Sequence, residues 1–125
     1  MAYLYVALGG ALGSVARYLM QSFIGHYTGP GFPYGTLIVN ISGSAIMGLF
    51  IGWLARGDLL HGQDLRLFVA IGILGGYTTF SSFSLESITL MEEGRWGAMG
   101  AYIAASVVLS LAGLLMGLRL MRAFA

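Results

Sequence analysis

The chain has 125 residues, of which 58% are apolar and only 9% are charged. Soluble domains carry about a quarter charged residues, so this composition excludes an ordinary water-soluble globule and predicts a membrane protein. The formal charge is +1 without a basic cluster, which excludes a nucleic-acid-binding surface. The absence of cysteine excludes disulfide frameworks and thiolate chemistry.

Four charge-poor segments have the length of helices that cross a bilayer. We therefore expect an all-α protein with one domain of residues 1–125 and membrane spans at 2–24, 34–55, 67–91 and 96–118. The first span is not expected to be a cleaved signal peptide, because it lacks a positive n-region and further spans follow it.

Three short stretches are expected to connect the spans. Residues 25–33 are rich in Gly and Pro and predict a turn, 56–66 carry several charges and predict an aqueous loop, and 92–95 predict a tight connection. If the connections alternate between the two sides of the membrane, four arginines lie on one side and two on the other. This weak bias permits insertion in both orientations.

Glycines spaced four apart occur in every expected span. Such small-xxx-small spacing lets helix backbones approach closely in lipid, so we interpret these glycines as packing surfaces. The pairs are Gly9 and Gly13, Gly48 and Gly52, Gly72 and Gly76, and Gly113 and Gly117.

Polar groups within the first two spans are costly in lipid and need an explanation. Arg17 either extends to the interface or lines a water-filled vestibule. Asn40 and Ser44 lie four residues apart and share a helix face.

The third span carries Gly75-Gly76 followed by two threonines. This run predicts a helix break near residues 75–79, and irregular backbone at membrane depth is tolerated only in protein or beside a cavity. The break is either a simple kink or an unwound turn whose free carbonyls bind a small hard cation.

Hydroxyl groups and two phenylalanines follow the expected break. Phe80 and Phe83 are either packing residues or present the positive edges of their rings to a pore for a small anion. Glu86 either lies in a vestibule or accepts structural hydrogen bonds.

Tyr102, Ser106 and Ser110 repeat every four residues in the fourth span. Such a ladder either joins helices through hydrogen bonds or lines an ion path. No histidine lies within a span to form a nucleophile–base pair, so we do not expect an enzyme.

Three motifs together resemble the small microbial fluoride channels called Fluc or CrcB: Gly13-x-x-x-Arg17, Asn40-x-x-Gly43, and the string of residues 75–84, GGYTTFSSFS. The resemblance covers essentially the whole chain. It implies an antiparallel, dual-topology homodimer in the plasma membrane, with two pores that export fluoride passively and relieve fluoride toxicity.

The resemblance also implies roles for particular residues. A structural Na⁺ would be bound by the main-chain carbonyls of Gly75 and Thr78, and Arg17 and Glu86 would belong to the vestibule. The residues implied to line the fluoride pore are Asn40, Thr79, Phe80, Ser81, Ser82, Phe83, Tyr102, Ser106 and Ser110. Family members often have Thr at the position of Ser82, a difference that keeps the hydroxyl.

Two other functions remain as alternatives. A dual-topology multidrug/proton exchanger has a similar size, but it needs a deep carboxylate, and the first span carries Arg17 and no acidic residue. A non-transporting membrane scaffold would use the polar ladder only to hold its helices together.

Overall fold

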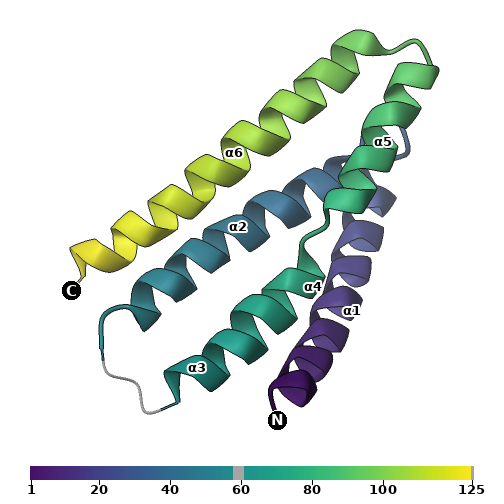
Figure 1. Ribbon diagram of the computed structural model, residues 1–125. Helices are drawn as coiled ribbons and strands as arrows, with labels where there is room; N and C mark the ends of the chain where they lie inside the picture. The colour runs from purple at the N-terminus through teal and green to yellow at the C-terminus, as the bar shows by residue number, and fades with distance from the viewer. Residues whose placement is uncertain (58–60, 125) are drawn as a thin grey trace.

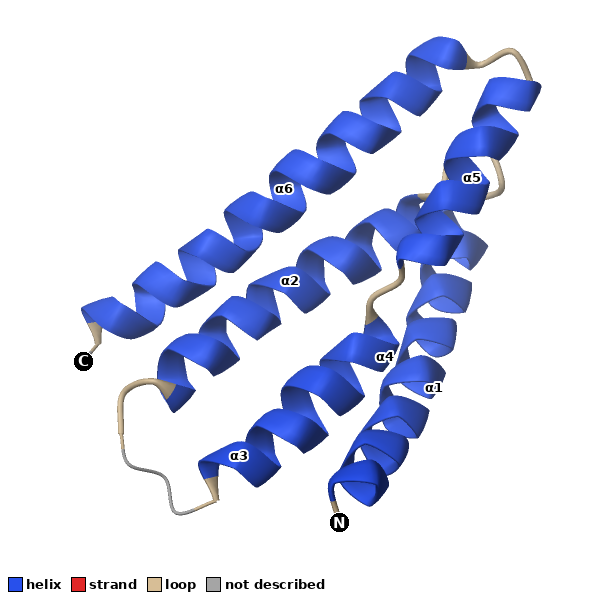
Figure 2. Ribbon diagram, in the orientation of Figure 1, coloured by secondary structure: helices blue, strands red, loops and turns tan. Residues whose placement is uncertain are grey.

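The computed structural model describes residues 1–57 and 61–124, and this part of the chain is helical with short connections (Figures 1 and 2). The helices are α1 (Ala2–Thr28), α2 (Tyr34–Leu54), α3 (Gly62–Leu65), the π-helical η1 (Arg66–Leu74), α4 (Gly75–Tyr77), α5 (Phe80–Glu92) and α6 (Trp96–Ala123). Because α3, η1 and α4 follow one another without a gap, they form one continuous rod up to Tyr77.

Several helix ends differ from those expected. α1 continues through Gly25 to Thr28, because the chain turns only at Gly29, whose φ of +76° suits glycine and whose N–H bonds to the Gly25 carbonyl. The expected loop 56–66 is already helical from Gly62, while residues 58–60 lie outside the described part. α6 likewise extends past residue 118 to Ala123.

The expected break in the third span is confirmed, but it begins later than Gly75. Gly75 and Gly76 remain helical, whereas Thr78 (ψ 156°) and Thr79 (ψ 121°) are extended, as suits β-branched residues. Gly76 serves a different purpose: a Cβ there would lie 2.6 Å from the Gly10 carbonyl oxygen of α1. Its lack of a side chain permits helix packing and does not break the helix.

Glycine contacts hold the helices in two pairs. α1 packs on η1 and α4, where a Cβ on Gly13 would overlap the Ile73 carbonyl. α2 and α6 run side by side in the same direction (Figure 1), and a Cβ on Gly117 would lie 2.6 Å from the Ala45 oxygen. The predicted role of these glycines as packing surfaces is thus confirmed at both pairs.

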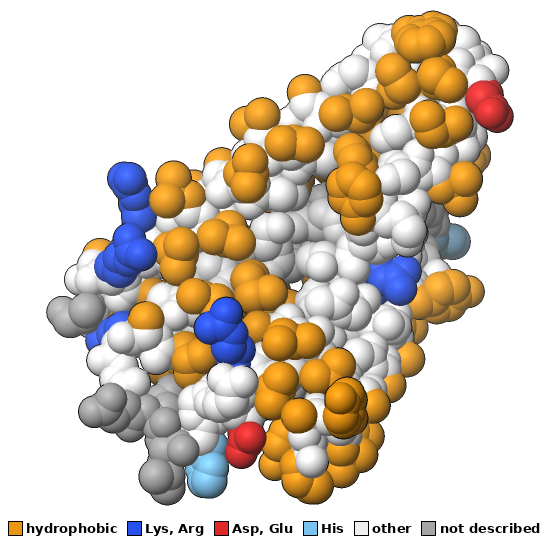
Figure 3. Space-filling view, in the orientation of Figure 1, with side chains coloured by type: hydrophobic (Ala, Val, Ile, Leu, Met, Phe, Trp, Pro, Cys, Tyr) orange, Lys and Arg blue, Asp and Glu red, His pale blue; other side chains and the backbone are white. Residues whose placement is uncertain are grey.

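Many large apolar side chains are exposed, and they cover much of the face seen in Figure 3. Among the described residues, three helical stretches are long and apolar enough to cross a membrane: Tyr34–Leu54, Gly62–Glu92 and Trp96–Ala123. At most 22% of the most apolar window of any of them is buried within the chain, so lipid or another protein surface must cover the rest.

Candidate functional site

The site is organised around the extended residues Thr78 and Thr79, where the chain leaves α4 and enters α5. The side-chain amide of Asn40, on α2, binds both main-chain groups of Thr79. Its Nδ2 donates to the Thr79 carbonyl at 3.0 Å, and its Oδ1 accepts from the Thr79 N–H at 2.8 Å. Thr79 in turn begins α5, because its hydroxyl accepts from the N–H of Ser82 at 3.2 Å. Asn40 therefore replaces the hydrogen bonds that the interrupted helix loses.

The break also frees main-chain carbonyls. Arg17 donates from Nε to the Gly76 carbonyl at 3.1 Å. The usual helical donors to Gly75 and Thr78 are the N–H groups of Thr79 and Ser82, and both bond to side chains instead. Within the described residues, the carbonyls of Gly75 and Thr78 therefore accept no hydrogen bond. Uncharged oxygens of this kind are suitable ligands for a hard cation.

A cavity of about 430 Å³ lies against the break, between α2, α5 and α6. We call it the break cavity. Its walls are mostly apolar, and the residues that matter for its chemistry are Asn40, Thr78, Thr79, Phe80, Phe83, Ser106 and Ser110.

Two hydroxyl groups in the wall of the break cavity have no hydrogen-bond partner among the residues that the structure describes. The oxygens of Ser106 and Ser110 are buried, and Ser106 as a whole is only 6% exposed. Other hydroxyls of this chain bond back to a carbonyl of their own helix, as those of Ser84, Ser87 and Thr89 do. A buried hydroxyl without a partner costs free energy, so its persistence needs an explanation.

The two phenylalanines of the break cavity lie next to each other. The rings of Phe80 and Phe83 are 5.5 Å apart between centroids, and Phe83 also contacts the ring of Tyr102 at 5.3 Å. Phe80 is 78% exposed, so in this chain it is not a core packing residue.

A second cavity, of about 510 Å³, lies under the turn between α1 and α2. We call it the turn cavity. Glu86 lies in its wall and accepts from Thr36 Oγ1 and from Tyr102 OH, each at 3.0 Å. Gln21 Nε2 donates to the same Thr36 hydroxyl at 2.9 Å.

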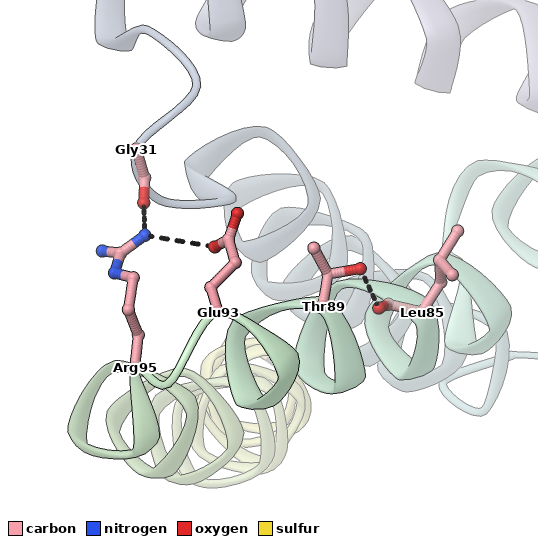
Figure 4. A network of polar contacts seen from close by, with 5 residues as sticks. All are labelled: Gly31, Leu85, Thr89, Glu93 and Arg95. Carbon is pink, nitrogen blue, oxygen red and sulfur yellow. Dashed lines mark hydrogen bonds and ion pairs between the residues drawn. The ribbon is translucent and has the colours of Figure 1, made fainter.

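Charged residues border the turn cavity at the α5–α6 connection (Figure 4). Arg95 donates to the Gly31 carbonyl, and its guanidinium lies 3.8 Å from Glu93. Thr89 lies in the last turn of α5, four residues before Glu93, and donates to the Leu85 carbonyl at 2.8 Å. These exposed contacts hold the connection against the turn, although an exposed ion pair contributes little stability.

Comparison with known proteins matches residues 4–118 to the family described as "CrcB-like protein, Camphor Resistance (CrcB)". The chain belongs to this CrcB family. A relative from Nitrobacter hamburgensis, named "Fluoride-specific ion channel FluC 1", is 53% identical over 95% of this chain and 94% of the relative. Relatives of similar name come from Opitutus terrae (47% identity; 92% and 88% covered) and Agrobacterium fabrum (50%; 94% and 93%).

Membership of the CrcB family agrees with the apolar helices and confirms two predictions. The chain is a multi-pass membrane protein of a channel family, and it is not an enzyme. The resemblance inferred from the three motifs is thereby confirmed.

The structure divides the predicted CrcB site residues between several places. Glu86 and Ser82 line the turn cavity, and the buried Tyr102 hydroxyl is directed to Glu86 and not along the serine ladder. Ser81 is exposed and lies within 3.3 Å of the Thr79 hydroxyl, and Arg17 lines neither cavity. The remaining predicted pore residues meet at the break cavity: Asn40, Thr79, Phe80, Phe83, Ser106 and Ser110.

Two polar residues of the turn cavity, Gln21 and Thr36, were not predicted from the sequence. Gln21 lies four residues after Arg17, and Thr36 lies four residues before Asn40, so each shares a helix face with a residue that was predicted. The criterion that selected Asn40, a polar side chain within an apolar helix, would have found both.

Proposed function

We propose that this chain is a fluoride-selective channel that exports fluoride passively across the plasma membrane and relieves fluoride toxicity. The observation that carries the proposal is the pair of buried, unpartnered hydroxyls, Ser106 and Ser110, in the wall of the break cavity. The names of the relatives, fluoride-specific ion channels, support the same conclusion.

The chemistry of the break cavity suits a small, strongly hydrated anion. Leaving water costs such an ion far more than any single contact returns, so several donors must replace the water in succession. Ser106 and Ser110 supply free hydroxyl hydrogens, Asn40 has a second amide hydrogen beyond the one bound to Thr79, and Phe rings have positive edges. None of these groups carries a full positive charge that would trap the ion.

A second copy of the chain completes the pore in this proposal. One chain leaves Phe80 78% exposed beside a break cavity that is only partly enclosed. Lipid would cover this face poorly because Ser81 is exposed as well. We propose an antiparallel homodimer of dual-topology subunits with two pores. Each subunit is then one domain of residues 1–125 with four spans, α1 included.

A structural Na⁺ at the break is part of the proposal. Gly75 and Thr78 provide two main-chain oxygens free of hydrogen bonds, and Gly75 is exposed, so these oxygens fit a cation held between two copies. The ion would supply positive charge that holds the break in place. Arg17, on the Gly76 carbonyl, leaves the two oxygens free.

The function is tested by ion efflux from liposomes that contain the purified protein. We expect fast fluoride efflux without a proton gradient, and chloride efflux at least a hundredfold slower. Equal efflux of the two halides, or drug-driven proton movement typical of a multidrug exchanger, would contradict the proposal. A folded protein that passes neither ion would favour the scaffold.

A further inference from the structure

A chain of hydrogen bonds connects four helices at the turn cavity. Gln21, on α1, donates to Thr36 on α2, and Thr36 donates to Glu86 on α5. Tyr102, on α6, donates to the other oxygen of the same carboxylate. Three of these residues, Gln21, Thr36 and Glu86, line the turn cavity.

The Gln21 amide determines which way the hydrogen bond between Thr36 and Glu86 is donated. A threonine hydroxyl has one hydrogen to donate, and its oxygen can also accept. Because the Gln21 amide donates to the Thr36 oxygen, the single hydrogen of Thr36 is directed to Glu86 Oε2. Thr36 is buried, at 2% exposure, so water cannot easily take over the part of Gln21.

The backbone is shaped to bring Gln21 to Thr36. A Cβ on Gly35, the neighbour of Thr36 on α2, would lie 3.1 Å from the Cα of Gln21. The glycine thus lets α1 and α2 approach at the residue that donates. This close approach makes the 2.9 Å bond possible.

We propose that Gln21 is a positioning residue for anion passage, an inference that rests on the proposed fluoride channel. Its amide fixes the Thr36 hydroxyl, and through it the orientation of the Glu86 carboxylate in the turn cavity. Without the Gln21 donor, the Thr36 hydroxyl is free to turn, and the carboxylate loses one of its two fixed donors. Its negative charge can then swing into the turn cavity, which in the proposed channel is the vestibule that the anion crosses.

The test is a double-mutant cycle of fluoride efflux from liposomes, with Gln21→Met and Thr36→Val separately and together. Gln21→Met keeps the bulk of the side chain and removes the donor, and we expect it to lower efflux about tenfold. If Gln21 acts through Thr36, the double variant should conduct no more slowly than Thr36→Val alone, since the coupled contacts are lost together.

The matched control is Ser22→Ala, an exposed neighbour on α1 that lines neither cavity, and it should leave efflux unchanged. The inference is overturned if Gln21→Met conducts like wild type, or if the losses of the two single variants multiply, as expected for separate packing defects.

Should Gln21→Met fail to fold, Gln21→Asn, whose amide is too short to reach Thr36, replaces it in the same cycle. Wild-type efflux in the same liposomes separates the two proposals: its absence defeats the channel, whereas its presence with an unchanged variant defeats only the role of Gln21.

Discussion

At the scale of single residues, the buried and half-buried polar side chains of the site have two kinds of task. The side-chain amide of Asn40 binds the N–H and the carbonyl of Thr79. The hydroxyls of Tyr102 and Thr36 both donate to the Glu86 carboxylate. The hydroxyl hydrogens of Ser106 and Ser110, by contrast, have no acceptor in the described part of the chain. The first kind maintains the structure of the site, and the second kind is available to an ion, as is the remaining amide hydrogen of Asn40.

This division predicts that Ser106→Ala separates function from stability. Fluoride efflux should fall about tenfold because a donor is lost, while the free energy of unfolding should stay within about 0.5 kcal/mol of wild type or rise, since an unpartnered buried hydroxyl is removed. Efflux assays and thermal unfolding in detergent measure the two quantities.

Ser87→Ala is the matched control for Ser106→Ala. Ser87 is also 6% exposed, but it lies on α5 and its hydroxyl already bonds to the Phe83 carbonyl at 2.8 Å. Its loss should leave efflux near wild type. A Ser106→Ala protein that unfolds readily but conducts normally would reverse the assignment.

At the scale of elements, close backbone contact decides which helices pair. α1 meets η1 and α4 through glycines on both sides of the contact, and η1 adopts π-helical turns over the same stretch. In lipid, where apolar side chains gain little by leaving the solvent, such contact replaces the hydrophobic drive. Glycine position therefore determines stability here more than helix propensity does.

The element scale predicts a contrast between two neighbouring glycines of α1. Gly13→Ala would drive its Cβ into the Ile73 carbonyl and should destabilise the fold by about 3 kcal/mol or more. Gly10→Ala meets no atom within 4 Å and should fold like wild type. Yield of monodisperse protein and thermal unfolding compare the two, and equal stability would show that the α1–η1 contact is not tight.

At the scale of the whole molecule, one chain leaves the face around its break cavity partly uncovered. Its break cavity is only partly enclosed, Phe80 is exposed beside it, and Gly75 is exposed near the middle of the membrane-spanning stretch Gly62–Glu92. A second copy placed antiparallel on this face would bring the two Gly75 residues together. The N-terminal ends of the two α6 helices would then lie at opposite surfaces of the membrane.

Because the natural chain has no cysteine, single-cysteine variants test this arrangement directly. Gly75→Cys, whose Cβ would have an ordinary 3.6 Å contact with Ala70, should form a disulfide-linked dimer of twice 13.3 kDa under mild oxidation. Gly97→Cys, in open space at the start of α6, should not. Gel electrophoresis without reductant reads the result; cross-linking at Gly97 alone would indicate a parallel dimer.

The sequence by itself determined that the chain is helical and belongs in a membrane. It also determined where three of the apolar helices lie and that the third expected span is broken before Phe80. Composition and hydropathy report these properties because each depends on local residue types. It also placed Asn40, Phe80, Phe83, Ser106 and Ser110 among the site residues, and the structure brings these five together at one cavity.

Only the tertiary structure decided how those side chains are used. It narrowed the predicted break near residues 75–79 to Thr78 and Thr79, because Gly75 and Gly76 stay helical and Gly76 is needed for contact with α1. It turned the Tyr102 hydroxyl away from the serine ladder to Glu86, and it made Gln21 the donor that orients Thr36. A hydrogen bond between distant helices depends on how closely their backbones approach, and residue spacing along one helix carries no information about that distance.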